Sequence, residues 1–326
     1  MTMSAAIKTP RAALLATLLV LSVFPLFGSD YYSELLTKIM IMAIFAMSLD
    51  LLVGFTGLVS FGHAAFFGIA AYAVVLVSPQ YDPSSLWLVL PAAVLAAAVA
   101  AFVVGLFVLR TKGIYFIMVT LAFAQMIYFV FHDSPLGGGS DGVFINFKPE
   151  LRVGETQLLD LGDAGHFYYV VLLLLVATYV FLRILLRSPL GHALAGIKSN
   201  EHRMLSLGFP VFLYKLAGFV IAGALAGVAG FLSACQFGFV TPEILSWHQS
   251  GNVLLMVILG GMGTLNGAAI GAFAFVVLQE VFSALTKHWQ FLMGTVIVLV
   301  VMLLPGGLSS LTQRLRRLLL GGSSNG

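Results

Sequence analysis

Catalysis, metal binding and ATP binding each require particular residues, so we first consider the histidines, the cysteine and nucleotide-binding motifs of this sequence. Its seven histidines are scattered, and no two have the HExxH spacing that zinc hydrolases use. The one cysteine, Cys235, excludes an internal disulfide and a thiolate metal cluster. No GxxxxGK[ST] loop is present, so the chain does not bind ATP through that motif. We therefore predict no catalytic residue, no metal site and no cofactor bound by this chain.

Two dense runs of glycine are the next feature that suggests a function. They lie inside apolar segments, at 54–68 (GFTGLVSFGHAAFFG) and 260–273 (GGMGTLNGAAIGAF). In each run, two glycines spaced by three precede a polar residue, Ser60 or Asn266, and a helix of small residues follows. Paired glycine breaks are typical of duplicated transporters near the permeation path, whereas small residues also simply let membrane helices pack closely. Both interpretations stay open, and they are compatible.

The residues around these breaks are candidate contacts for a translocating solute. They offer backbone dipoles and small polar groups in an otherwise apolar passage, which suits a solute that must shed its water. One of them, His63, has a second interpretation, as a partner in a hydrogen bond between two helices. The candidate translocation residues are Gly57, Ser60, His63, Gly263 and Asn266.

Membrane helices are the elements that must position these residues. Hydrophobic residues make up 60% of the 326 and charged residues only 9%, whereas soluble domains carry about 25% charged residues. We predict an all-α polytopic membrane protein of about ten transmembrane helices, with a pseudo-repeat and broken helices. The run that ends at 262 is short, so a discontinuous segment is its alternative. The apolar runs are 12–28, 35–53, 58–77, 86–109, 114–131, 167–186, 211–233, 252–262, 268–282 and 290–304.

The basic residues predict which side of the membrane each loop occupies, because inner loops are enriched in lysine and arginine. If the chain crosses the membrane about ten times, most of the basic residues lie on its inner face. Both termini are then in the cytoplasm. Asp50 and Glu201 are the acids on that face. The formal net charge of +3 is too small to indicate nucleic acid. The basic residues assigned to the inner face are Lys8, Arg11, Arg110, Lys112, Arg183, Arg187, Lys198, Arg203, Lys215, Arg314, Arg316 and Arg317.

The chain is predicted to form one transmembrane domain over residues 1–320. An external loop at 132–166 is rich in glycine and aspartate and is long enough to contact an external partner. The stretch from 311 to 320 carries three arginines among leucines, so we expect it to lie on membrane lipid. Residues 321–326 are expected to be a flexible tail.

The longest cytoplasmic loop, 187–210, contains a predicted amphipathic helix. Pro189 is suited to the first helical position, and apolar residues recur at helical spacing until Gly208 and Pro210 stop the helix. Such a helix on the inner side of the membrane is either a surface anchor or a docking element for a cytoplasmic partner. Periodicity alone does not separate the two.

Motifs along most of the chain resemble a known family, the LivM-type permease subunits of bacterial ABC importers for branched-chain amino acids. They occur in the family's order from residue 35 onward. The motifs are GLVSFGHAAFFGIAAYA (57–73), GGGSDGV (137–143), SPLGHALAGIKSNE (188–201), KLAGFVIAGALAGVAGFL (215–232), VILGGMGTLNGAAIGA (257–272) and LLPGGL (303–308).

The resemblance implies the machinery around this chain. Such a subunit lies in the bacterial inner membrane, pairs with a second homologous permease, docks cytoplasmic ATP-binding subunits that use the ATP, and receives its amino acid from a periplasmic solute-binding protein. The sequence departs from the family at His192, Arg203 and Met204, where a basic residue and two small residues are usual. The residues that match the family's ATPase coupling loop are Gly191, Ala195, Lys198, Asn200, Glu201 and Gly208.

Two alternatives to this function remain at the level of sequence. One is the same kind of ABC permease for urea, short amides or another small solute. The other, from a different class, is an ion-coupled secondary transporter or channel that works without an ATPase. Coupled carriers usually keep an ionisable group at mid-membrane, whereas Lys38, Asp50 and Glu280 lie near predicted helix ends, which disfavours this second alternative.

Overall fold

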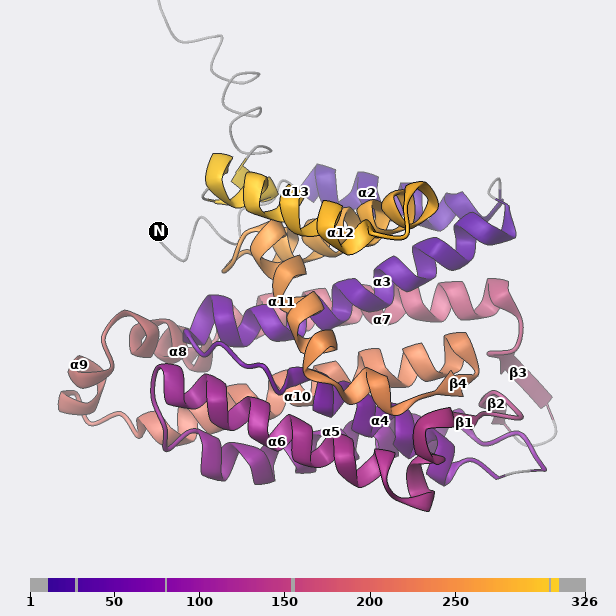
Figure 1. Cartoon of the computed structure of the whole chain (residues 1–326), viewed down its shortest axis with the longest axis horizontal. Coiled ribbons are helices and arrows are strands. Elements are labelled where there is room, and N and C mark those ends of the chain that lie inside the picture. The colour runs from indigo at the N-terminus through magenta and orange to yellow at the C-terminus, as the bar shows by residue number, and fades with distance from the viewer. Residues whose placement is uncertain (1–10, 27–28, 80, 154–155, 305, 311–326) are drawn as a thin grey trace, which may run out of the picture.

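The computed structural model describes residues 11–26, 29–79, 81–153, 156–304 and 306–310 and is mostly helical. Lys8, Arg314, Arg316 and Arg317 and the predicted lipid-bound and flexible tails lie outside these residues. Most helices run roughly along one long axis (Figure 1), whereas α11 runs across the others in that view. The helices are α2 (Arg11–Val23), α3 (Asp30–Asp50), α4 (His63–Val77), α5 (Leu86–Val108), α6 (Ile114–His132), α7 (Ala164–Arg187), α8 (Pro189–Ser199), α9 (Glu201–Ser206), α10 (Val211–Phe237), α11 (Trp247–Gly260), α12 (Leu265–Leu285) and α13 (Trp289–Leu303).

Six of the described helical segments are long and apolar enough to cross a membrane. They are α3 with its continuation to Thr56, α5, α6, α7, α10 and α12. Two shorter apolar helices are α4 and α13, and α2 and α11 have 13 and 14 residues. At about 1.5 Å per residue, helices of this length fall short of a hydrocarbon core of roughly 30 Å. Ten helices thus match the ten apolar runs, and ten full crossings stay a prediction.

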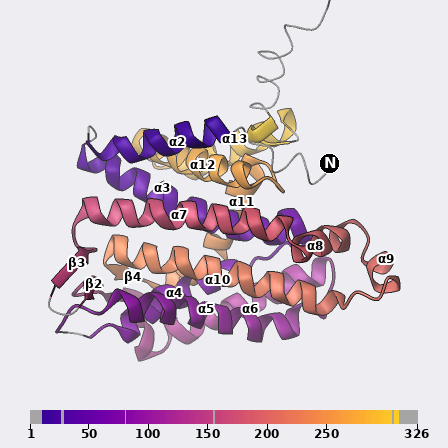
Figure 2. The same cartoon turned by 180° about the vertical axis from the view of Figure 1, so that it is seen from behind.

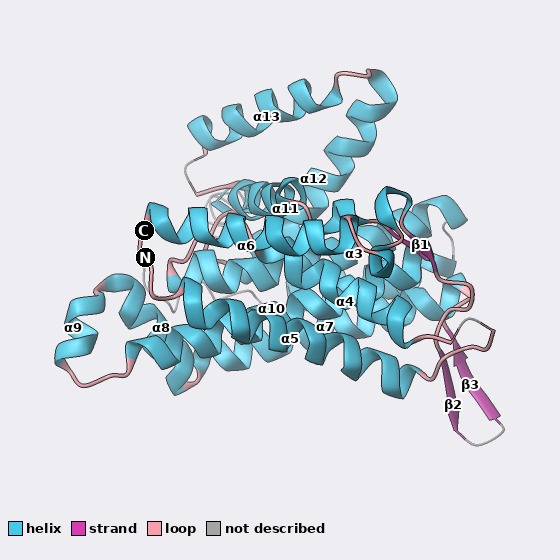
Figure 3. Cartoon of the chain, turned by 60° about the horizontal axis from the view of Figure 1, so that its bottom comes forward, coloured by secondary structure: helices cyan, strands magenta, loops and turns pink. Residues whose placement is uncertain are grey.

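Four short strands correct the all-α prediction. In the loop at 132–166, β2 (Glu150–Val153) pairs antiparallel with β3 (Thr156–Asp160). The strand β1 (Val143–Phe144) pairs antiparallel with β4 (Phe239–Val240), which follows α10. The strands β1, β2 and β3 lie at one end of the molecule, and α8 and α9 lie at the other end (Figure 3). Strands of two to five residues are too short to form a hydropathy pattern, so the sequence did not predict them.

Small residues of α10 explain how the bundle packs. This helix lies between α7 and the α4–α5 pair (Figure 2). A β-carbon at Gly223 or Gly227 would press on the alanine side chains of α5, and one at Gly230 would overlap the carbonyl of Phe67 on α4. Close backbone approach through small residues is the usual way that membrane helices associate. The packing use of glycine is therefore present in this fold.

Candidate functional site

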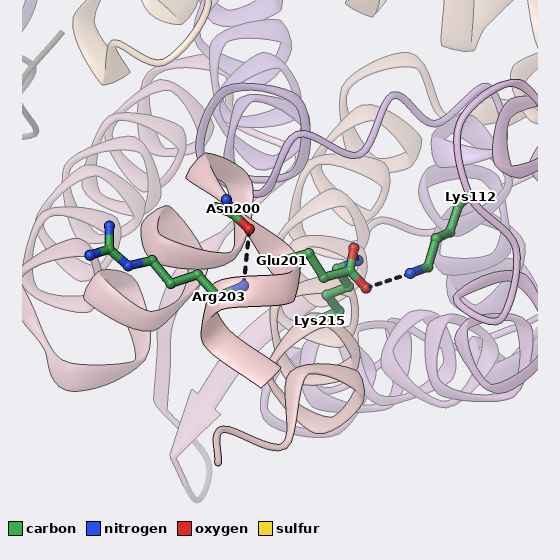
Figure 4. Close-up of polar contacts among 5 residues, drawn as sticks. All are labelled: Lys112, Asn200, Glu201, Arg203 and Lys215. Atoms are coloured by element: carbon green, nitrogen blue, oxygen red, sulfur yellow. Dashed lines mark hydrogen bonds and ion pairs between the residues drawn. The ribbon is translucent and has the colours of Figure 1, made fainter. Parts of the chain in front are cut away.

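The loop at 187–210, which we call the inner loop, folds as two helices rather than the single one predicted from sequence. Between α8 and α9, Asn200 is extended, with φ −159° and ψ 100°. Its Oδ1 accepts a hydrogen bond from the backbone N–H of Arg203 at 2.9 Å (Figure 4). An asparagine side chain at this position replaces the backbone acceptor of a continuing helix, so a new helix begins there. Gly208, with φ +83°, makes the turn that leaves α9.

The helix α8 is anchored by its apolar face. Gly191, Ala193, Leu194 and Ile197 are buried, and a β-carbon at Gly191 would collide with the backbone at the end of α7. Ser188 accepts a hydrogen bond from the N–H of Gly191 at 3.5 Å, at the start of the helix. This face fixes α8 to α7 and α10, so a force applied to α8 acts on membrane helices directly.

Glu201 begins α9 and holds it to two other segments. Its Oε2 accepts a hydrogen bond from Lys215 Nζ of α10 at 2.8 Å. Its Oε1 lies 3.0 Å from Lys112 Nζ, in the turn between α5 and α6 (Figure 4). Burial alone acts to raise the pKa of Glu201, but the two lysines outweigh it and lower that pKa. The carboxylate therefore stays charged at neutral pH.

The two lysines were not identified as site residues from the sequence. A signal was present, because Glu201 is one of two acids on a predicted inner face that is otherwise basic. An acid among many bases is expected to attract partners, but sequence does not say which bases reach it. The fold brings Lys112 and Lys215 to it from segments far apart in the chain.

Lys198, near the end of α8, reaches the first glycine break. Its Nζ donates a hydrogen bond to the carbonyl of Gly54 at 2.5 Å. The stem of the same side chain lies over Gly57, where an added β-carbon would meet Lys198 Cγ at 3.2 Å. Gly57 has φ +76° and ends a short π-helix at Leu51–Thr56. The lysine thus ties the inner loop to the irregular end of α3.

The two glycine breaks meet beside this lysine. The buried carboxylate of Asp50, through Oδ1, accepts a hydrogen bond from the backbone N–H of Gly263 at 2.7 Å. A β-carbon at Gly54 would overlap both Asp50 Oδ1 and Gly263 N, so only glycine fits there. Gly263 itself has φ +77°. We call Asp50, Gly54, Lys198 and Gly263 the inner junction.

The five candidate translocation residues do not form one open surface in this structure. Gly57 is exposed and Gly263 is half-buried, and both lie at or beside the inner junction. Ser60 is fully buried, and Asn266 is half-buried in the first turn of α12. His63 is fully buried and hydrogen-bonded through Nε2 to Ser48 of α3 at 2.9 Å. Contact of these five with a solute stays a prediction.

Metal coordination has no candidate among the described residues. No three histidine, cysteine, aspartate or glutamate side chains come together there as a metal site would require. The carboxylate of Glu201 instead contacts two lysines, Lys112 and Lys215. What this arrangement provides is polar contacts that join α8 to the first glycine break and α9 to α10.

Known proteins resemble this chain over most of its length. The family model of the branched-chain amino acid transport system permease component matches residues 31–302. The LivM permease protein of the high-affinity branched-chain amino acid transport system of Escherichia coli is 34% identical over 319 residues, or 92% of this chain and 75% of that protein. No solved structure matches the chain.

More distant relatives include other permeases. The LivH permease protein of the Salmonella typhimurium branched-chain amino acid system is 22% identical over 82% of this chain and 90% of that protein. A permease protein of an autoinducer 2 import system, LsrC of Photorhabdus laumondii, is 24% identical over 52% of each chain. The similarity therefore extends to permeases whose names give a different solute.

Proposed function

The chain belongs to the family of branched-chain amino acid transport system permease components, and from that membership we propose that it is one membrane-spanning subunit of an ATP-driven importer of branched-chain amino acids. It is a multi-pass membrane protein and a transport permease. The observation that carries the proposal is the similarity to LivM over 92% of the chain. The relative named for autoinducer 2 import favours one second candidate, a permease of the same kind for another small solute.

The partners follow from this function. A companion permease of the same family completes the passage, and the resemblance of this chain to both LivM and LivH supports such a pair. ATP is bound and hydrolysed by separate cytoplasmic subunits, and an external binding protein delivers the amino acid. The chain crosses the bacterial inner membrane about ten times, with both termini in the cytoplasm.

The inner loop supplies the surface for the ATP-binding subunits. Large apolar side chains are exposed on and after α9, namely Leu205, Leu207 and Phe209, which are 49%, 66% and 37% exposed. His202 and Arg203 are exposed beside them. Exposed apolar groups rimmed by polar ones are typical of a protein interface. The firm anchoring of α8 below them supports a role as a lever.

ATP-driven motion then has a defined route through the chain. Movement of α9 pulls on α10 and the α5–α6 turn through Glu201, and movement of α8 pulls on the first glycine break through Lys198. Asp50 passes the displacement to the second break at Gly263. Residues with flexible backbone at both breaks let the membrane helices change angle rather than bend along their length.

Reconstitution tests the proposal. The chain is extracted in mild detergent, the proteins that copurify are identified, and the complex is placed in vesicles with its binding protein. We expect leucine uptake that requires ATP and all subunits, and competition by isoleucine and valine but not by urea. Leucine uptake by the purified chain alone under an ion gradient would refute the proposal, and competition by urea alone would assign a different solute.

A further inference from the structure

A large cavity opens at the end of the molecule opposite the inner loop. Its volume is about 860 Å³, and its walls come from α3, α4 and α6, from the end of α10, from β4, from Pro242–Leu245, and from α11, α12 and α13. β4 and α9 lie at opposite ends of the molecule in Figure 1. The volume falls in the range of roughly 300–1,000 Å³ typical of small-molecule sites. None of the five candidate translocation residues lines it.

The polar side chains of this cavity are mostly uncharged. Glu243 is the single carboxylate among its lining residues, and neither lysine nor arginine is among them. His248 stacks on Trp247 with ring centroids 4.0 Å apart. Side-chain amides line it at Gln125, Gln249, Asn252, Gln279 and Gln290, and side-chain hydroxyls at Tyr128, Ser233, Thr241 and Ser246.

Apolar side chains form the other half of the lining. They give an aliphatic and aromatic wall that suits a branched hydrocarbon side chain, because burial of apolar surface contributes roughly 25 cal/mol per Å². The wall includes Met42, Ile244, Leu255, Phe275, Met293 and Ile297.

We propose that this cavity binds the amino acid itself, as a zwitterion, on its way into the membrane; the proposal rests on the importer function above. Glu243 takes the ammonium group, and the side-chain amides take the carboxylate. The first turn of α11 also lines the cavity, and its N-cap residue Ser246 makes no side-chain cap hydrogen bond, so backbone N–H groups there are suited to the same carboxylate. The apolar wall takes the side chain.

This arrangement selects by charge as well as by shape. A carboxylic acid without an ammonium group meets Glu243 as a like charge, which disfavours binding. Urea has neither a charge for Glu243 nor a hydrocarbon group for the wall. The cavity therefore favours aliphatic amino acids first, aliphatic amines second, and carboxylic acids and urea last.

Tryptophan fluorescence of the detergent-purified complex measures this binding without transport. Two of the three tryptophans, Trp247 and Trp289, line the cavity, and Trp87→Phe removes the third. We expect a saturable fluorescence change with leucine. In separate titrations, isoamylamine should reach half-saturation at a higher concentration than leucine. The corresponding concentrations of 4-methylpentanoate and of urea should be at least tenfold higher than that of leucine.

Two variants test the residues named. Glu243→Gln should raise the leucine concentration at half-saturation about tenfold, the loss expected for one charge-assisted hydrogen bond, whereas the exposed Asp82→Asn outside the cavity leaves it unchanged. Gly294→Phe fills the cavity from α13, where a β-carbon meets nothing within 4 Å. Gly251→Phe, at an equally open position of α11 that does not line the cavity, is its matched control.

The fluorescence titration decides this proposal whatever the uptake measurement gives. Loss of leucine binding in Glu243→Gln and Gly294→Phe, with both controls intact, supports it. Unchanged half-saturation in both cavity variants overturns it, even if the unmodified complex imports leucine normally. Absence of ATP-driven leucine uptake by the unmodified complex refutes the importer function instead.

Discussion

Charge reversal at Glu201 tests the coupling role of the inner loop. In the structure this carboxylate bridges Lys215, whose side chain is 10% exposed, and Lys112, whose side chain is 63% exposed. A hydrogen bond to a charged, largely buried partner contributes about 1.5–3 kcal/mol, whereas an exposed ion pair contributes about 0–1 kcal/mol. Glu201→Gln should therefore destabilise the attachment of α9 by about 2 kcal/mol, nearly all of it through Lys215.

The reversed charge has a larger effect than the neutral variant. Glu201→Lys places a third ammonium group beside Lys112 and Lys215, which repel it, so α9 separates from α10. We expect vesicles carrying the complete complex to hydrolyse ATP while importing several-fold less leucine per ATP. The assay measures both quantities in the same preparation, and cross-linking of the subunits confirms that the complex is assembled.

Partner variants separate the bridge from a general effect of charge. Lys215→Met should reproduce most of the loss of Glu201→Gln, and the double variant should lose little more, because the two residues share one interaction. Lys112→Met should change little. A folded Glu201→Lys complex with the normal ratio of leucine to ATP would refute the coupling role.

Three further predictions concern the same inner end. Gly54→Ala should reduce transport and lower the unfolding temperature in detergent, since its β-carbon would overlap Asp50 Oδ1 and Gly263 N; a normal variant would contradict the close contact. Lys198→Met removes the hydrogen bond to Gly54 O and should lower leucine imported per ATP with little change in insertion, whereas equal coupling would show that α8 acts without it. Because the pKa of Glu201 is lowered on folding, its stabilisation is complete above about pH 5 and is lost as the pH falls through that lowered value. Acid unfolding curves between pH 7 and pH 3 should therefore be less steep for Glu201→Gln, and identical curves would refute this assignment.

Sequence patterns located the helices well, because membrane helices are long apolar runs and hydropathy reports them directly. Ten helices of the structure overlap the ten predicted runs. The division of the inner loop at Asn200 was missed, although asparagine is a strong N-cap residue. Apolar periodicity continues across it, and a periodicity argument gives that pattern more weight than a single capping residue.

The inner junction was predictable only in part. The sequence shows both glycine breaks, with Gly54 and Gly57 in one and Gly260 and Gly263 in the other. In the fold Gly54 lies against Gly263, a contact that a sequence similarity does not predict, because it depends on how the two segments pack. The cavity at the other end escaped sequence analysis, since its lining comes from many segments that no local pattern connects.

The helix α11 links the cavity to the second glycine break. Its first turn lines the cavity, and it ends at Gly260, the first residue of the break that contains Gly263. In that same first turn, Ser250 accepts a hydrogen bond from the N–H of Ala64 at 3.0 Å, which fixes this end of α11 to the start of α4. We expect a displacement that enters at Lys198 and passes through Asp50 to Gly263 to move the Gly260 end of α11 relative to this fixed turn. The cavity residues Asn252 and Leu255 lie between that fixed turn and Gly260, so they move with the helix and change the shape of the cavity when the inner loop moves.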